Sequence, residues 1–258
     1  MKKIICCLII FQNIFCLSQT IDANGKKQGY WKKKDEKTNK LIYEGAFLNN
    51  IPNGKFKYYH PNDSIKAIMI FSNNGEISYS ELFNSNGKKM AKGKYYKELK
   101  DSIWIYYDDS GLLISKENYI KGKKEGGSFV YLPDGSISEE KNYKQDIQHG
   151  EFKQYFDGKN LKSKGNYING ALNGKTCYYY PNGIEVAEGF YSKGQKTGIW
   201  IYKDEKGKIT EKELYQNNKL CSKKVMEDFL AKNKLNNEKQ KEEINKTESK
   251  KIESKQKR

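Results

Sequence analysis

The side chains that most often perform chemistry in proteins are scarce in this chain. Its 258 residues include 2 histidines, and both His60 and His149 stand in sequences typical of turns. Histidine is the commonest general base and metal ligand, so isolated turn histidines argue against both roles. Neighbouring acids such as Glu139 and Glu140 point to opposite faces of a strand and cannot share a substrate. We therefore expect no enzyme activity, no catalytic residue, no bound metal and no cofactor, and no small-molecule substrate is indicated.

The formal net charge is +16, from 48 Lys+Arg against 32 Asp+Glu. Almost all of the positive charge is lysine, and Arg258 is the single arginine. The planar forks with which arginine reads phosphates and bases are therefore missing, and we expect no nucleic-acid partner. A lysine-rich surface still favours non-specific attraction to anionic polymers or glycolipids of a cell envelope.

The first 18 residues have the pattern of a secretory signal peptide. Two lysines provide the positive start, and an apolar run follows from Ile4 to Leu17. This run is too short and interrupted to remain as a membrane-spanning helix. We expect cleavage after Ser18 and export to the periplasm, the cell envelope or the extracellular space. Acylation of Cys16, as in a lipoprotein, is the alternative.

The composition changes over residues 219–258, which contain no Gly, Pro, Tyr or Trp. Val225, Met226, Phe229 and Leu230 would share one side of a helix, and Ser222 stands where an N-cap belongs. We expect a short capping helix followed by a disordered tail rich in Lys and Glu. A basic arm for anionic surfaces is the alternative interpretation.

The strongest pattern is an aromatic residue that recurs every 24 positions. Its eight members are Phe47, Phe71, Tyr95, Tyr119, Tyr143, Tyr167, Tyr191 and Tyr215. Glycine columns keep the same phase; one includes Gly126, Gly150 and Gly174, with Ser78 and Ser102 at two of its positions. Several columns in one register indicate a repeat array.

One unit has the layout of a β-hairpin. Residues 167–174 are predicted to form a turn because Asn-Gly tolerates positive φ angles, and residues 175–180 a strand. The Pro-Asn-Gly turn at 181–183 leads to a return strand at 184–191, where Gly189 would let an aromatic ring approach closely. A lone hairpin is marginally stable, so the units must pair edge to edge. The sequence predicts an all-β fold over residues 19–218: an elongated single-layer antiparallel β-hairpin repeat array.

The repeat geometry also decides the state of the two cysteines outside the leader. Cys177 would lie in the first strand of its hairpin and Cys221 after the last strand of the next. Three strand steps separate them by about 14 Å, which exceeds the roughly 7 Å limit for a disulfide. We expect two free thiols.

The run Tyr-x-Asn-Gly-x-x-Asn-Gly-Lys followed by Tyr-Tyr-Tyr-Pro-Asn-Gly, at 167–183, resembles the MORN repeat in its bacterial variant form. The resemblance covers roughly residues 24–218 and implies antiparallel hairpins that serve as scaffolds, protein-docking surfaces or lipid binders. Some secreted bacterial relatives are labelled antitoxins. The units at 24–47 and 72–95 depart most from the pattern, and we expect them to bulge or bend.

A partner-binding surface is predicted from large aromatic residues spaced by 48. This aromatic lane consists of Phe56, Tyr58, Trp104, Tyr106, Phe152, Tyr178, Trp200 and Tyr202. Aromatic residues are enriched at binding hot spots. The alternative is structural: the small residues Ser80, Ser128 and Thr176 alternate with the large rings in the same column, which would give large–small packing between units.

Two functions of different class follow from these features. The first is an exported, non-catalytic scaffold that binds another envelope or secreted protein, as an antitoxin or immunity protein does. The second is a peripheral binder of anionic envelope glycolipid or membrane surface, using the lysine-rich turns and tail. Salt dependence separates them, because only the second should weaken steeply with ionic strength.

Overall fold

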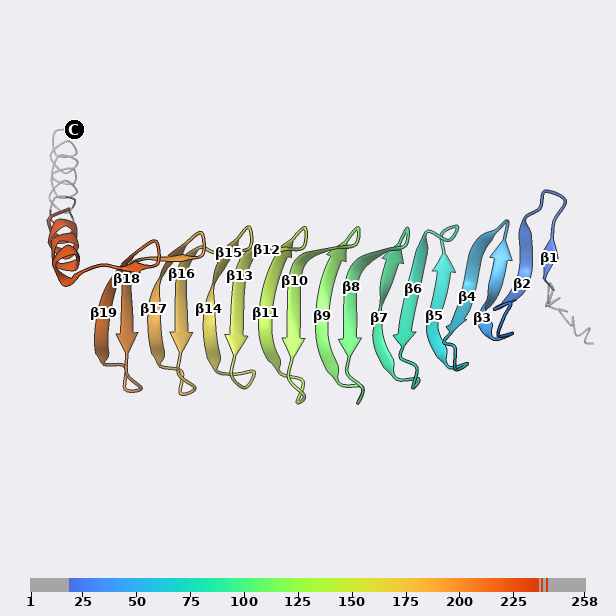
Figure 1. The fold of residues 1–258 in the computed structure, drawn as a ribbon, viewed down its shortest axis with the longest axis horizontal. Helices are drawn as coiled ribbons and strands as arrows, with labels where there is room; N and C mark the ends of the chain where they lie inside the picture. Colours follow the sequence, from blue (N-terminus) through green and yellow to red (C-terminus); the bar gives the residue numbers. More distant parts are fainter. Residues whose placement is uncertain (1–18, 237, 239, 241–258) are drawn as a thin grey trace, which may run out of the picture. The chain divides into compact units, whose positions relative to one another are not determined.

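The computed structural model describes residues 19–236, 238 and 240. The predicted signal peptide, its cleavage site and Cys16 lie outside the described residues, as does the tail at 241–258. The contacts divide the chain into two compact units, which adjoin in sequence between Ser136 and Ile137. Both units consist of antiparallel strands (Figure 1), so the predicted all-β hairpin array is confirmed.

The first unit is an open sheet of consecutive antiparallel strands. These are β1 (Thr20–Ile21), β2 (Lys27–Lys34), β3 (Leu41–Leu48), β4 (Ile51–Tyr59), β5 (Ile65–Ser72), β6 (Ile77–Phe83), β7 (Lys89–Tyr96), β8 (Leu99–Tyr107), β9 (Leu113–Ile120) and β10 (Lys123–Tyr131). Each strand pairs with the next along the chain. This is the nearest-neighbour contact pattern of a repeat array.

The second unit continues the same pattern with some strands divided. It contains β11 (Ile137–Lys144), β12 (Ile147–Gln148), β13 (Gly150–Tyr155), β14 (Leu161–Ile168), β15 (Ala171–Leu172), β16 (Gly174–Tyr179), β17 (Glu185–Ser192), β18 (Gln195–Lys203), β19 (Ile209–Gln216) and β20 (Lys219–Leu220). A helix follows at 223–236. Ser222 Oγ accepts a hydrogen bond from the backbone N–H of Val225 at 3.5 Å, as predicted for the N-cap.

Of the four apolar side chains predicted to make the capping contact, only Met226 is partly buried. Val225, Phe229 and Leu230 are all exposed, so the predicted helix is present while a capping contact through these three residues is not. Within the described part of the chain, no helix has both the length and the apolar character needed to cross a membrane.

The hairpins are joined by two kinds of turn. Asn169 and Gly170 have φ angles of 51° and 81°, which matches the type I′ turn that suits the twist of a hairpin. This turn has two residues, so the predicted turn at 167–174 was too long: β14 extends to Ile168, and β15 begins directly after Gly170. The second predicted turn is confirmed, because the N–H of Gly183 donates to the Tyr180 carbonyl at 2.9 Å.

A β-bulge recurs at the glycine column, where the predicted turn at 167–174 was expected to end. Between β7 and β8, Lys92 pairs with Ile105 and Lys94 pairs with Asp101. Three residues of β8 therefore lie opposite a single residue of β7. Ser102 lies inside this bulge with a φ of 59°, a conformation that usually favours glycine. The column therefore marks bulges rather than the ends of long turns.

The unit at 72–95 differs from the others in where its register is interrupted. Its strand β6 pairs with β5 without interruption, from Ala67–Leu82 to Ser72–Ile77. Ser78, which occupies the bulge column, lies in this regular register. Because Ser78 takes no positive φ, β6 lacks the bulge that other units carry at this column. The unit is still irregular, because the pairing of β6 with β7 shifts register between Leu82 and Phe83.

Aromatic rings seated on strand glycines form the core of each sheet. A Cβ added at Gly45 would overlap Phe56, one at Gly93 would overlap Trp104, and one at Gly189 would overlap Trp200. The predicted close approach of a ring to the strand glycine is thus confirmed. A single layer of strands gains a core in this way because the ring covers the backbone directly.

Candidate functional site

The large members of the aromatic lane are buried. Trp104 has 0% and Trp200 1% of its surface exposed, and Phe56 and Phe152 are also buried. The indole N–H of Trp104 donates to the Lys94 carbonyl at 2.9 Å. A ring with no exposed surface cannot touch a partner while the sheet is folded, so burial favours the packing interpretation for these four residues.

The small residues of the same column are buried as well. Ser80, Ser128 and Thr176 alternate with the large rings, and Thr176 is among the most deeply buried residues of the described chain. The hydroxyls of Ser80 and Thr176 have no hydrogen-bond partner among the described residues. These positions therefore provide room for rings, which is the predicted large–small packing.

Lysine and tyrosine side chains cover the two indoles. The Lys100 ammonium lies 4.8 Å from the ring centre of Trp104 and donates to the Tyr106 hydroxyl at 2.7 Å. Tyr119 donates to Glu117 at 2.5 Å, and burial, followed by this carboxylate, raises the pKa of Tyr119. The tyrosine hydroxyls thus find partners within the chain.

The second unit repeats this arrangement. The Lys196 ammonium lies 4.2 Å from the ring centre of Trp200 and 3.1 Å from the Tyr202 hydroxyl. The Tyr178 and Tyr191 hydroxyls are 3.2 Å apart. Tyr58, Tyr106, Tyr178 and Tyr202 are the partly exposed members of the aromatic lane, and partner binding through them stays a prediction.

The opposite face of the first unit carries an apolar hollow that the sequence analysis missed. We call it the outer hollow; it has a volume of about 820 Å³ and its lining includes Lys55, Ile68, Ile70, Tyr79, Glu81, Lys92, Lys94, Ile103 and Ile105. Ile70, Tyr79 and Ile103 expose 51%, 59% and 58% of their surfaces. Side chains alternate across a strand, so Tyr79 and Ile103 face away from their buried neighbours Ser80 and Trp104.

A signal for this hollow was present in the repeat columns. The column of Tyr79 and Ile103 holds Lys55, Glu151 and Lys175 in three other units, and Gly127 and Ile199 in two more. Adjacent apolar residues at an outward position that is charged in three other units indicate a surface with another role. The regular pairing of β5 with β6 runs through this part of the sheet, and β-bulges normally increase local twist.

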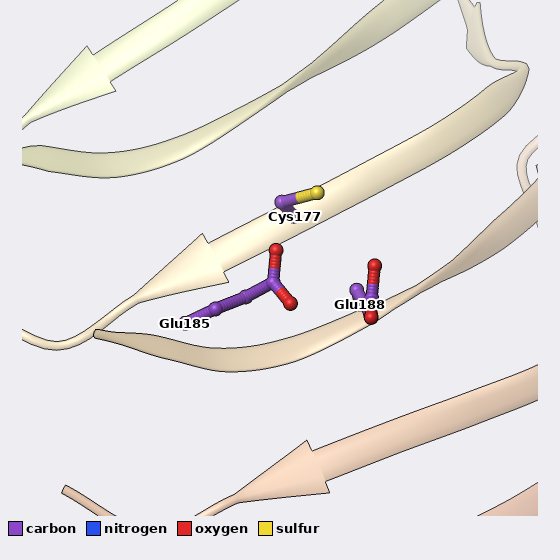
Figure 2. Close-up of side chains that lie close together, drawn as sticks. All are labelled: Cys177, Glu185 and Glu188. Atoms are coloured by element: carbon purple, nitrogen blue, oxygen red, sulfur yellow. The ribbon is translucent and has the colours of Figure 1, made fainter. Parts of the chain in front are cut away.

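The opposite face of the second unit brings together a thiol and two carboxylates (Figure 2). Cys177 in β16 and Glu185 and Glu188 in β17 place one Sγ and two carboxylate oxygens within 4.8 Å of one another. We call these three residues the thiol–carboxylate cluster. Cys177 is a free thiol, as is Cys221, which confirms the prediction for both. Burial, then the Glu185 carboxylate, raises the pKa of the Cys177 thiol.

Lysines neutralise the two carboxylates. Lys203 in β18 lies 2.6 Å from Glu185 and 3.6 Å from Glu188, and Lys175 forms an ion pair with Glu188. The pKa of Glu188 is lowered, first by the hydrogen bond from Lys175. The cluster was not found in the sequence because its members gather only when β16 and β17 pair.

His60 begins a turn, as predicted, whereas His149 lies between β12 and β13 and not in a turn. Nε2 of His60 lies 3.0 Å from the Phe83 carbonyl oxygen, and Nδ1 of His149 accepts from the Asn169 N–H at 3.4 Å. A nitrogen that is already hydrogen-bonded to the backbone holds a turn in place. These contacts favour a structural role for both residues.

An open antiparallel sheet made of repeated hairpins, with rings seated on glycines, defines this chain as a β-hairpin repeat protein. Three of its segments, residues 52–73, 148–169 and 196–217, match the family described as MORN repeat variant. These matches support a MORN repeat protein and agree with the resemblance drawn from the sequence. A comparison with curated protein sequences finds no match.

Proposed function

We propose that this chain is a non-catalytic repeat scaffold that binds another protein through the outer hollow. In this proposal the chain is exported and its partner is an envelope or secreted protein, including a toxin that it would neutralise. The MORN repeats support the scaffold part of the proposal. The structural role of both histidines supports binding rather than catalysis.

The outer hollow is the observation that carries this proposal. Ile70, Tyr79 and Ile103 together expose large apolar side chains on one face, and apolar patches of this kind mark interaction sites. Lys94 is paired with Asp101, whereas Lys55 and Lys92 form no ion pair within residues 19–236. The partner that fits is a protein segment with apolar side chains and an acidic margin.

The test is capture of a partner from the native envelope by variants of the hollow. Ile103→Glu places an acid among the apolar side chains and should abolish enrichment of the partner in quantitative mass spectrometry. Ile168→Glu is the matched control, because Ile168 is an exposed apolar residue outside the hollow. Equal enrichment by the wild type and by a normally melting Ile103→Glu variant would refute this surface.

Binding to an anionic envelope surface is the second candidate. The net charge of +16 favours it, because lysine-rich surfaces attract anionic polymers through long-range forces. Vesicles with anionic lipid should then capture the chain at low salt and release it above physiological ionic strength. Capture that resists salt but is lost in Ile103→Glu supports the protein partner instead.

A further inference from the structure

We propose that the thiol–carboxylate cluster of Cys177, Glu185 and Glu188 binds a thiophilic divalent cation of the Zn²⁺ class. Cysteine sulfur and carboxylate oxygen are both ordinary ligands of Zn²⁺. Three protein ligands leave a fourth position of a tetrahedron for water. A thiolate disfavours Mg²⁺ and Ca²⁺, which prefer sites made of oxygen alone.

The geometry requires only a small closure around the ion. The three ligand atoms lie within 4.8 Å of one another, and a tetrahedral Zn²⁺ with bonds of about 2.0–2.3 Å would hold them roughly 3.3–3.8 Å apart. The side chains must therefore approach by about 1 Å. Figure 2 shows the Glu185 and Glu188 carboxylates on the strand beside Cys177.

The repeat itself provides an internal comparison for this cluster. The column of Glu185 holds Leu or Ile in six of the eight units, namely Leu41, Ile65, Leu113, Ile137, Leu161 and Ile209. The remaining unit has Lys89 there, and this lysine pairs with Glu81, which stands in the column of Cys177. Two units thus replace the usual Leu or Ile by a charged residue: one has an ion pair, and the unit at 168–191 has a thiol beside a carboxylate.

Without a metal ion, lysine ammonium groups neutralise the carboxylates of the thiol–carboxylate cluster. Lys203 contacts both carboxylates, while the Cys177 thiol is 4% exposed and neutral when protonated. Metal binding would replace the Lys203 ammonium at the carboxylates and transfer the thiol proton to water as the sulfur–metal bond forms. No oxidation or reduction is involved. Cys177 also lines an open hollow of about 500 Å³, which gives an ion a route to the sulfur.

The probe is Co²⁺, since its bond to a thiolate gives a charge-transfer absorption band. The full chain is prepared reduced, with Cys6→Ser, Cys7→Ser and Cys16→Ser, so that Cys177 and Cys221 are its remaining thiols. We expect the band to saturate at one Co²⁺ per chain and to disappear when Zn²⁺ is added. Absence of the band in this folded protein would overturn the proposal.

Single substitutions assign the band to the cluster. Cys177→Ser should abolish it and Cys221→Ser should preserve it; the reverse result would refute the site. Glu185→Leu introduces the residue found in this column in other units, and should weaken Co²⁺ binding at least tenfold without lowering the melting temperature. Unchanged affinity in Glu185→Leu would exclude this carboxylate as a ligand and overturn the three-residue site.

Lys203→Met distinguishes a metal site from a purely structural ion-pair network. Removal of the competing ammonium should tighten Co²⁺ binding several-fold, because the carboxylates no longer have to exchange partners. Circular dichroism checks that the variant is folded at the temperature of the titration. Weaker Co²⁺ binding in the folded variant would contradict the competition on which the proposal depends.

Discussion

Trp104 lies directly on the backbone of Gly93, so closely that a methyl group at residue 93 would overlap the indole. Gly189 and Trp200 repeat this relationship in the second unit. The ring seals the strand from water and its N–H donates to the Lys94 carbonyl. One pair of residues, 11 positions apart in sequence, thus explains both a glycine column and an aromatic column of the repeat.

Gly93→Ala should lower the free energy of unfolding by about 1–3 kcal/mol, the usual cost of overpacking a core. Trp104→Ala removes the ring that the new methyl group would meet, so the double variant should cost less than the sum of the two single ones. Urea unfolding of the four proteins in this cycle measures the coupling. Strict additivity would show that the two residues do not contact each other.

Trp200→Ala should lower the melting temperature markedly, because loss of a buried large ring costs about 3–5 kcal/mol. Partner capture at a temperature where the variant remains folded should be unchanged, since Trp200 is 1% exposed. Capture and thermal unfolding are measured on the same preparation. Normal melting combined with lost capture would restore the aromatic lane as the docking surface.

Glycine substitutions at two positions of the bulge column should have opposite signs. Ser102 has a φ of 59°, so Ser102→Gly relieves a strained backbone and should be neutral or stabilising. Ser78 lies in a regular strand, where glycine should cost about 0.5–1 kcal/mol. Chemical denaturation of both variants provides the comparison. An equal loss of stability in both variants would contradict a bulge at Ser102 in β8 and a regular strand at Ser78 in β6.

Acid should weaken the first unit through Glu44. The hydrogen bond from the Tyr59 hydroxyl, at 2.7 Å, is the largest factor that lowers the pKa of Glu44, and Lys57 and Lys32 add to it. Because the folded pKa is below the unfolded value near 4.5, this stabilisation is complete above pH 4.5 and is lost as the pH falls through the folded pKa.

Glu44→Gln should therefore be less stable than the wild type at neutral pH and should show a shallower decline below pH 4.5. Glu36→Gln, at an exposed turn position, serves as the control and should follow the wild-type curve. Thermal melts across the acid range measure both. A wild-type slope in Glu44→Gln would remove Glu44 from the acid transition.

The same pair should respond to alkali through Tyr59. Burial, followed by the Glu44 carboxylate, raises the pKa of Tyr59 to about 12. The neutral phenol therefore stabilises the fold fully below its unfolded pKa of about 10, and this contribution is lost as the pH rises through about 12. Tyr59→Phe cannot ionise and should flatten this alkaline loss. An unchanged alkaline profile would show that Tyr59 does not contribute.

Most of the fold was predictable because repetition multiplies a weak local signal. A two-residue turn such as Asn169-Gly170 requires positive φ angles, and residues that tolerate them recur at a fixed spacing. The MORN resemblance and the free state of Cys177 and Cys221 followed from the same register. Ser222 could be assigned as an N-cap because capping depends on neighbours a few residues away.

The sequence by itself determined the repeat, its hairpins and its aromatic and glycine columns, since each of these depends on residues close together in the chain. Only the tertiary structure decided which rings are buried, where bulges replace turns, and that β6 pairs with β5 without a bulge. It also brought Cys177 beside Glu185 and Glu188, and gathered Ile70, Tyr79 and Ile103 into the outer hollow. The physical reason is strand register, because a shift of one residue moves every side chain to the opposite face.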